Sequence, residues 1–337
     1  MDTVDPPLQN TYNTLLRKSS INGHPVVVGA SAAVDERELP LIDLARLSQG
    51  EAEREECKRE IARAAREWGF FQIVNHGISG EILKRMRTEQ EKLFKQPFRV
   101  KTEDKVQNFS AGRYRWGGPT ATCLQQLSWL EAFHVPLTDI HADISASGGF
   151  STLSLIIEQF AIVASNLAQR LAEILADKMG QDGSFFEENC SPNACYIRMN
   201  RYPPCPMSSK VHGLVPHTDS DFLTVLNQDQ IGGLQLVKDG KWIAVKPNPQ
   251  ALVINIGDLF QAWSNGVYKS VEHKVVANKK VDRFSTAYFF CPSHDTMIRS
   301  CVEPSIYRNF SFREYMQQVQ DDVKKFGNKV GLPRFLI

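Results

Sequence analysis

Two residues that can bind a metal ion stand two positions apart in the run GLVPHTDSDFLTVL. They are His217 and Asp219, and the residues that follow them alternate like a β-strand. Side chains two positions apart in an extended segment point to the same face. An imidazole and a carboxylate side by side can be a surface ion pair, a buried hydrogen bond or two ligands of a metal ion. The pair by itself does not decide between these alternatives.

A third candidate ligand lies further along the chain. His273 stands in the middle of the strand-like run SVEHKVV. Two histidines and one carboxylate on rigid strands form the facial arrangement of non-haem Fe(II) sites, which leaves several coordination positions open. A catalytic zinc ion usually keeps one open position, so iron is favoured. We therefore predict that His217, Asp219 and His273 hold Fe(II).

The next strand-like run, RFSTAYFF, offers a site for an anion. Arg283 and Ser285 share one face of this strand, and a guanidinium beside a hydroxyl forms a fork for a carboxylate. The alternative, a surface arginine on an edge strand, is disfavoured because the neighbouring side chains are apolar. The same alternation predicts that Ala287, Phe289 and Cys291 continue this face toward the mouth of a pocket. Phe289 could equally be a core residue.

The segment 109–137 carries a second basic and aromatic group among glycines. Its run GRYRWGG, with Tyr114 and Arg115, suits a loop that meets an apolar acid. A solvated turn is an equally good interpretation of the same residues. The run SWLEAFHVPL that follows is strand-like and could line a pocket with Ala132 and His134.

Short strands and a few longer helices have to position these residues. From Ala194 to Ser293, short apolar runs are separated by Gly, Pro, Asn and Asp, which predicts a sandwich or a barrel. The longest helix signal covers 151–180, and its apolar residues fall on one face, so we expect it to back a sheet. Polar helices are expected near 51–68, 79–96 and 311–327. The prediction is a mainly β fold with flanking helices.

Changes in the pattern of polar, apolar and turn-forming residues divide the chain into five parts. We expect an N-terminal arm with at most a short helix at 1–38 and an N-terminal region of the main domain at 39–150. A long backing helix with its connection follows at 151–192. The β-rich core occupies 193–295, and a helical segment occupies 296–337.

Composition excludes several classes of protein. Among 337 residues, 39 basic and 38 acidic side chains give a net charge of +1, so there is no electrostatic footprint for nucleic acid or for a membrane surface. The chain lacks a signal peptide pattern and the run of about 18 apolar residues that a membrane span needs. Seven cysteines without a CxxC pair indicate a reducing compartment. We expect a cytoplasmic protein, with the nucleus as an alternative.

Several of these motifs together resemble a known enzyme family. HTD, SVEH and RFS, with NRYPPCP upstream and WGFFQIVNHGI near the start, are similar to the plant 2-oxoglutarate- and Fe(II)-dependent dioxygenases. The resemblance implies a double-stranded β-helix, or jelly roll, in which His217, Asp219 and His273 hold the iron. It also implies that the distal carboxylate of 2-oxoglutarate binds the side chains of four residues: Arg283, Ser285, Tyr202 and Asn200. Dioxygen would be the second co-substrate, and ascorbate the reductant.

Within this family the chain most resembles the gibberellin 2-oxidases. The runs YRWG and SWLEAFHVP are similar to those of the class that acts on C20 gibberellin precursors. The resemblance implies 2β-hydroxylation of a gibberellin-like diterpenoid acid, with release of succinate and CO₂. Two alternatives stay open: a sister enzyme acting on another gibberellin carbon, auxin or a flavonoid, or a ligand-binding sensor without turnover. The substrate-contacting residues we expect are Tyr114, Arg115, Ala132, His134, Phe289 and Cys291.

Overall fold

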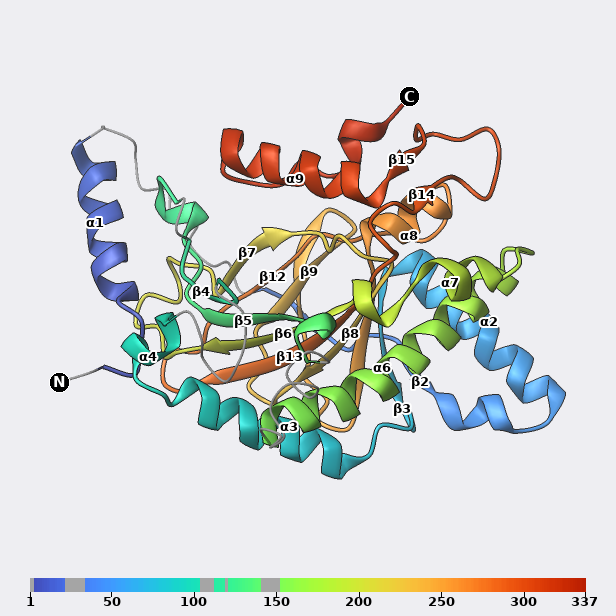
Figure 1. The fold of residues 1–337 in the computed structure, drawn as a ribbon, viewed down its shortest axis with the longest axis horizontal. Helices are drawn as coiled ribbons and strands as arrows, with labels where there is room; N and C mark the ends of the chain where they lie inside the picture. Colours follow the sequence, from blue (N-terminus) through green and yellow to red (C-terminus); the bar gives the residue numbers. More distant parts are fainter. Residues whose placement is uncertain (1–2, 22–33, 104–111, 119–120, 141–151) are drawn as a thin grey trace.

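Two β-sheets that face each other form the centre of the molecule. The structure is a computed structural model, and it describes residues 3–21, 34–103, 112–118, 121–140 and 152–337. In Figure 1 the sheet that carries β7 and β12 lies above the one that carries β6, β8 and β13. Side chains from both sheets share one apolar cluster, since Val275 of the first packs with Tyr202 and Ala132 of the second. Two facing sheets with mostly antiparallel pairing are what a jelly roll requires, and the predicted fold class is confirmed.

The larger sheet has eight strands and includes strands from the N-terminal region. Its order is β2 (Leu41–Asp43), β3 (Phe70–Val74), β11 (Leu252–Ile256), β8 (Leu223–Gln228), β13 (Arg283–Phe290), β6 (Tyr196–Tyr202), β5 (Glu131–Pro136) and β4 (Tyr114–Trp116). The smaller sheet has the order β1 (Glu36–Arg37), β10 (Lys241–Val245), β9 (Leu234–Lys238), β12 (His273–Val275) and β7 (Leu214–His217). A short pair, β14 (Met297–Ile298) and β15 (Phe310–Ser311), lies outside both sheets.

Helices cover the outer face of the larger sheet and the ends of the sandwich. They are α1 (Leu8–Ile21), α2 (Glu51–Glu67), α3 (Gly80–Phe94), α4 (Phe98–Thr102), α6 (Thr152–Asp177), α7 (Ser184–Asn189), α8 (Asp258–Trp263) and α9 (Phe312–Phe326). Figure 1 shows α3 and α6 beneath β13 and β6, and α9 on the opposite side near β14 and α8. The long helix α6 buries a continuous stripe from Leu153 to Ala176, so the expectation that it backs a sheet is confirmed.

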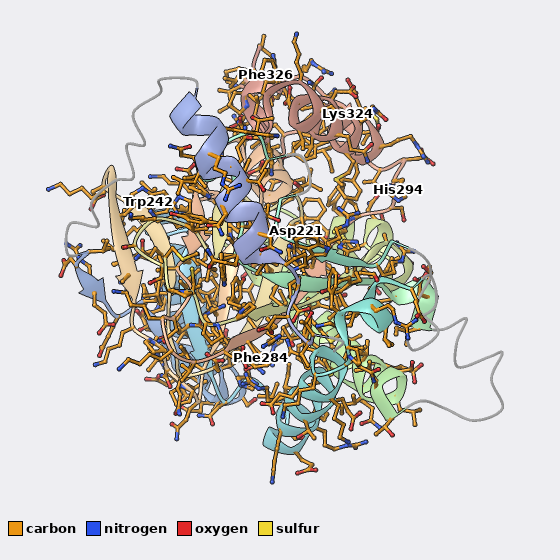
Figure 2. All side chains as sticks on the ribbon, turned by 90° about the vertical axis from the view of Figure 1, so that its left-hand side faces the viewer. Asp221, Trp242, Phe284, His294, Lys324 and Phe326 are labelled. Carbon is orange, nitrogen blue, oxygen red and sulfur yellow. The ribbon has the colours of Figure 1, made fainter. Side chains whose placement is uncertain are left out.

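The N-terminal arm departs from the prediction of at most a short helix. Helix α1 has 14 residues, and Leu8, Tyr12 and Leu15 are buried on one of its faces. They pack against the segment that leads into β5, including Leu127 and Trp129. Figure 2 looks directly onto α1 as it crosses the near face of the molecule. The prediction was wrong because polar residues outnumber apolar ones in this helix, although the three buried residues keep helical spacing.

The region around Tyr114 also differs from its prediction. The sequence suggested a loop or a solvated turn, but Tyr114–Trp116 forms the edge strand β4, which pairs with β5. Parts of the arm and of the segment 109–137 lie outside the described residues. The five-part division of the chain stays a prediction, and β2 to β5 show how closely its second part joins the core sheet. In the described part of the chain, no helix has both the length and the apolarity that crossing a bilayer demands.

Candidate active site

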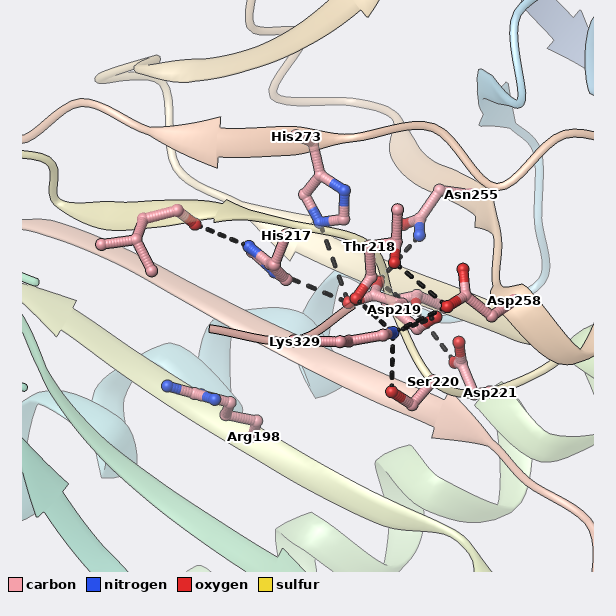
Figure 3. Close-up of polar contacts among 12 residues, drawn as sticks. Arg198, His217, Thr218, Asp219, Ser220, Asp221, Asn255, Asp258, His273 and Lys329 are labelled. Carbon is pink, nitrogen blue, oxygen red and sulfur yellow. Dashed lines mark hydrogen bonds and ion pairs between the residues drawn. The ribbon is translucent and has the colours of Figure 1, made fainter. Parts of the chain in front are cut away.

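The three predicted metal ligands meet between the two sheets. His217 ends β7 and His273 begins the neighbouring strand β12, where the two residues are directly paired. Asp219 follows β7, and its Oδ1 lies 3.6 Å from His217 Nε2 and 3.8 Å from His273 Nε2. Among the described residues, this is the one group of three or more His, Cys, Asp or Glu side chains that could hold a metal ion. Figure 3 shows the three side chains converging on one point.

Backbone carbonyls fix both imidazole rings with the same nitrogen turned inward. His217 Nδ1 lies 2.8 Å from the Val215 carbonyl oxygen, and His273 Nδ1 lies 3.1 Å from that of Val271. A carbonyl only accepts, so each Nδ1 carries the ring proton and each Nε2 keeps a lone pair for a metal. Burial and the neighbouring His273 lower the pKa of His217 to about 3, which keeps that ring neutral at physiological pH.

The carboxylate of Asp219 is held by its outer oxygen. Oδ2 accepts hydrogen bonds from Thr224 Oγ1 at 2.7 Å and from Asn255 Nδ2 at 2.8 Å. Burial would raise the pKa of Asp219, but the two imidazoles and these hydrogen bonds outweigh it and lower the pKa to about 2. Asp219 is therefore an anion whose Oδ1 faces the two imidazole nitrogens.

A second carboxyl group, that of Asp221, lies behind the first and is fully buried. Its Oδ2 is 3.0 Å from Thr224 Oγ1, while its Oδ1 has no hydrogen-bond partner. Burial and the nearby Asp219 raise the pKa of Asp221 well above its ordinary value. Burial therefore disfavours the charged form of Asp221, and within the described residues this carboxyl group is not among the side chains that converge on the metal position.

The donor set fits Fe(II). Ligand atoms that each lie about 2.0–2.2 Å from one ion are about 3–3.5 Å apart, so the observed separations close onto a metal with small movements. Two imidazoles and one carboxylate on one side leave the opposite side open, as in non-haem iron oxygenases. Every ligand is also supported by a hydrogen bond to its other polar atom, which is typical of metal sites.

Arg283 lies on the inner face of β13 and is 1% exposed. Its Nε donates to the Gly232 carbonyl at 2.5 Å, and one terminal nitrogen donates to Gln228 Oε1 at 2.7 Å. The other terminal nitrogen, Nη1, has no hydrogen-bond partner, and no carboxylate pairs with this guanidinium among the described residues. The face of the Tyr202 ring lies 4.9 Å from the guanidinium carbon. A buried cation with an open donor is a binding site for an anion.

The other residues predicted for the co-substrate share the same inner face. Ser285 is paired with Asn200 across the β13–β6 ladder, and Asn200 Nδ2 donates to Ser285 Oγ at 3.3 Å. Gln228, which the sequence analysis missed, lies opposite Ser285 on β8, and its Nε2 has no hydrogen-bond partner within the described parts of the chain. Strand alternation could have identified Gln228, because it stands four positions after Thr224 and therefore lies on the same face of β8.

Aromatic rings continue this inner face beyond Arg283. Phe289 stacks on Tyr196 of β6 with ring centroids 4.4 Å apart, and His134 of β5 lies 4.2 Å from the same Tyr196 ring. Burial, followed by the nearby arginines, lowers the pKa of His134 to about 4, so this imidazole is neutral at physiological pH. We call Phe289, Tyr196 and His134 the aromatic shelf; sequence analysis had predicted two of its three members.

Arg198 is a basic residue of this face that sequence analysis also missed. It lies on β6 opposite Ala287, and its Nε donates to Asn200 Oδ1 at 2.9 Å. Figure 3 shows its guanidinium on the His217 side of the triad, and its charge contributes to the low pKa of His217. Strand alternation could also have identified Arg198, since residues 198, 200 and 202 of one strand must share a face.

The remaining substrate candidates fall in different places. Tyr114 lies on the outer face of the sheet, where its hydroxyl donates to Glu131 at 2.6 Å, and this position speaks against a substrate contact. Arg115 alternates to the inner side opposite Ala132, with an exposed side chain at the edge of the sheet. Ala132 is buried beside Tyr202. Cys291 lies past the end of β13, is 1% exposed and has a thiol whose pKa burial raises. Substrate contacts of these residues stay predictions.

Comparisons with known proteins agree with this geometry. Residues 193–292 match the model of the 2OG-Fe(II) oxygenase superfamily, and residues 39–143 match that of the non-haem dioxygenase in morphine synthesis N-terminal region. The chain is 61% identical to gibberellin 2-beta-dioxygenase 8 of Arabidopsis thaliana, with 99% of each chain covered. It is 51% identical to gibberellin 2-beta-dioxygenase 6 of Oryza sativa subsp. japonica, with 98% of this chain and 96% of the relative covered.

Solved structures with the same fold include two of plant enzymes. The crystal structure of JOX2 in complex with 2OG, Fe and JA matches with a TM-score of 0.72 at 30% identity, covering 86% of this chain and 87% of that one. The crystal structure of the dioxygenase for auxin oxidation in rice matches with a TM-score of 0.71 at 28% identity, covering 89% of this chain and 100% of that one.

Proposed function

This chain belongs to the 2OG-Fe(II) oxygenase superfamily, and from its identity to gibberellin 2-beta-dioxygenases we infer that it hydroxylates a gibberellin at C-2β. The reaction uses Fe(II), 2-oxoglutarate and O₂, with ascorbate as the reductant that keeps the iron ferrous. His217, Asp219 and His273 are the ligands we propose for the iron. The product would be an inactivated hormone or hormone precursor, with succinate and CO₂ released.

The open donor of Arg283 is the observation that carries this proposal. A guanidinium that is 1% exposed and has no carboxylate partner among the described residues would be costly without an incoming anion. The distal carboxylate of 2-oxoglutarate supplies that anion, and Gln228 Nε2 and Ser285 Oγ lie on the same inner face to complete its hydrogen bonds. Arg283 and Ser285 would hold that end of the co-substrate, and His217, Asp219 and His273 would hold the metal that its other end chelates.

The protein contributes placement and exclusion of water. When bound, Fe(II) with 2-oxoglutarate and O₂ supplies the oxidising chemistry that hydroxylates an unactivated C–H bond. Asp219 and the two histidines are held by hydrogen bonds before any ligand arrives, and Arg283 fixes the far end of the co-substrate. The aromatic shelf offers an apolar surface for fused rings, with Phe289 only 8% exposed in the free protein.

For the substrate we propose a C20 gibberellin acid whose carboxylate is bound by Arg198. This residue brings a guanidinium to the inner face near the metal position, and within the described residues its hydrogen bond runs from Nε to Asn200. Arg115, at the sheet edge, is the second basic residue on this side and suits a further carboxylate. All seven cysteines are free, which supports a location in the reducing cytoplasm.

A substrate panel tests this proposal. The purified protein would receive Fe(II), 2-oxoglutarate and ascorbate with C20 gibberellins, C19 gibberellins, flavanones or indole-3-acetic acid. We expect 2β-hydroxylated C20 gibberellins, identified by mass and by the position of the hydroxyl group. Turnover of a flavanone or auxin without any gibberellin product would place the protein in a sister branch, and turnover of C19 gibberellins alone would contradict the C20 assignment.

Two arginine variants locate the substrate carboxylate. Arg198→Gln should raise the KM for the gibberellin about ten-fold to a hundred-fold, the effect of losing a charge-assisted hydrogen bond. The matched control is Arg115→Gln, since Arg115 is on the same side but exposed. We expect a much smaller change there. Substrate-free decarboxylation of 2-oxoglutarate should persist in both variants. A larger rise in the gibberellin KM for Arg115→Gln than for Arg198→Gln would mean that Arg115 binds the substrate carboxylate instead.

A further inference from the structure

Lys329 lies far along the chain from the metal ligands, yet its side chain contacts the loop that carries one of them. The residue follows helix α9 and is 12% exposed at its side chain. Its ammonium nitrogen lies 3.0 Å from the Thr218 carbonyl, 3.3 Å from the Asp219 carbonyl and 2.9 Å from Ser220 Oγ. One cation therefore binds three consecutive residues, and the middle one is the proposed carboxylate ligand (Figure 3).

The same ammonium group forms an ion pair with a buried carboxylate. Asp258, at the first position of α8, is 3% exposed, and its Oδ2 lies 2.9 Å from Lys329 Nζ. That oxygen also accepts hydrogen bonds from Thr218 Oγ1 at 3.1 Å and from the hydroxyl of Tyr315 in α9. The backbone N–H of Asp258 donates to the Asp219 carbonyl at 3.0 Å. The ligand's backbone oxygen is thus held by two donors, and both come from this pair.

The approach of the C-terminal segment is close enough to restrict its sequence. Gly331 has a φ of 74°, and a Cβ at this position would lie 2.9 Å from Asp258 Oδ2. The turn after α9 therefore brings Lys329 and the backbone directly against the ion pair. This contact does more than complete the hydrophobic core, because it connects the C-terminal segment to the loop of residues 218–220.

We propose that Lys329, paired with Asp258, is a positioning residue that preorganises the 218–220 loop for metal binding. The side-chain oxygen of Asp219 is already oriented by Thr224 and Asn255, and Lys329 fixes the backbone from which that side chain projects. Removing the ammonium group takes a donor away from the Thr218 and Asp219 carbonyls and from the Ser220 hydroxyl, and metal binding must then order this loop again. The consequence is weaker metal binding. This inference rests on the iron site of the proposed function and is independent of the substrate.

The test measures metal affinity directly. Metal-free protein would be titrated with Co(II), whose visible absorption reports its coordination by histidine and carboxylate. Lys329→Met should weaken Co(II) binding about 10- to 100-fold, the range found when groups that support metal ligands are removed. The matched control is Lys178→Met: that lysine is similarly shielded, at 19% side-chain exposure, but it pairs with Glu55 away from the site. We expect wild-type Co(II) affinity in the control.

A double variant separates positioning from charge compensation. Lys329→Met alone leaves Asp258 as a buried charge and could prevent folding, whereas Lys329→Met combined with Asp258→Asn removes both charges. If Lys329 positions the loop, the double variant folds and still binds Co(II) weakly. Wild-type Co(II) affinity in either folded variant would overturn the proposal. Absence of Co(II) binding in the wild-type protein would instead contradict the iron site itself.

Discussion

The sheet formed by β5, β6 and β13 carries a buried polar cluster on each of its two faces, and the clusters differ in how completely their atoms are paired. On the outer face, Glu131 is fully buried and both of its oxygens are occupied: Lys101 and Tyr114 donate to Oε2, and Arg201 donates to Oε1. On the inner face, Arg283 keeps a terminal nitrogen without a partner. Both clusters bury charge, but only one of them has room for a ligand.

The outer cluster connects segments that are distant in the sequence. Lys101 of α4 also donates to the Val4 and Phe94 carbonyls at 2.9 Å, and Arg201 pairs with Asp282 at 2.9 Å and with Asp5 at 2.7 Å. Each of its two cations has at least one anionic partner, so no incoming anion is needed. This is the pattern of a structural network, in which every polar atom is satisfied by the protein.

The inner cluster has the opposite pattern. Arg283 is surrounded by neutral acceptors, Gln228 Nε2 is also without a partner, and the metal ligands direct two lone pairs and one anionic oxygen toward the same space. Other buried atoms lack partners too, such as Trp129 Nε1 and Tyr288 Oη, but each of those is a single neutral group. A buried cation without a counter-charge is the more informative observation, because its cost is relieved only by an anion.

The largest effect should come from removing the anionic metal ligand. Asp219→Ala takes away one of three protein ligands and leaves Thr224 and Asn255 with no carboxylate to orient. We expect loss of stable Fe(II) binding and no measurable gibberellin turnover. Iron content after anaerobic loading and product analysis by mass spectrometry measure the two losses separately.

The matched control for Asp219 is its neighbour. Asp221→Asn replaces a carboxyl group, whose pKa is raised by burial, with an amide of the same shape, and Asp221 is not among the three converging ligands, so iron binding should persist. If Asp219→Ala retains normal iron content while Asp221→Asn loses it, the two carboxylates have been assigned the wrong roles. The inner cluster would then be centred on Asp221.

The next effect in size concerns the outer cluster and is one of stability. Glu131→Gln leaves Lys101 and Arg201 buried without their shared anion, and breaking a buried ion pair from one side costs about 3–5 kcal/mol. Denaturant unfolding should show this loss in the free energy of unfolding. In the protein that remains folded, the KM for 2-oxoglutarate should be unchanged, because Glu131 lies on the outer face of the sheet and the proposed co-substrate site lies on the inner face. A marked rise in that KM would contradict the separation of the two clusters.

The inner cluster was largely predictable from sequence because its chemistry is encoded by short-range alternation. His217 and Asp219 are two residues apart, as are Arg283 and Ser285, and a strand presents such pairs on one face. The strands themselves were recognisable from short apolar runs separated by turn residues. Apart from Gln228, the residues proposed for the iron and the co-substrate could therefore be named without a structure, with Tyr202 and Asn200 coming from the family resemblance. Arg198, which we propose for the substrate carboxylate, was missed.

The features that were misassigned or missed in the sequence depend on contacts between distant segments, and no local sequence pattern indicates such contacts. Tyr114 was assigned to the pocket because it neighbours Arg115, and the β4–β5 pairing sends the two side chains to opposite faces. Lys329 and Asp258 are distant in sequence, and only the packing of α9 against α8 brings them to the metal loop. The helix α1 was underestimated for a similar reason, since its few apolar residues become significant only against the cluster they contact.

The smallest effect is expected from replacing an arginine by a lysine. This substitution sharpens the comparison most, because it can be made on each face of the same sheet. Arg283→Lys keeps the positive charge but loses the planar fork, so the Gly232 and Gln228 contacts and the open donor cannot all be kept. Loss of a hydrogen bond to a charged group costs about 1.5–3 kcal/mol, or roughly ten-fold to a hundred-fold in 2-oxoglutarate KM. Arg201→Lys on the outer face is the matched control, and it should lower stability while leaving that KM unchanged. Equal KM changes in both variants would mean that the satisfied and unsatisfied clusters are coupled. An unchanged KM in a folded Arg283→Lys protein would remove the open donor of Arg283 as the anchor of the co-substrate.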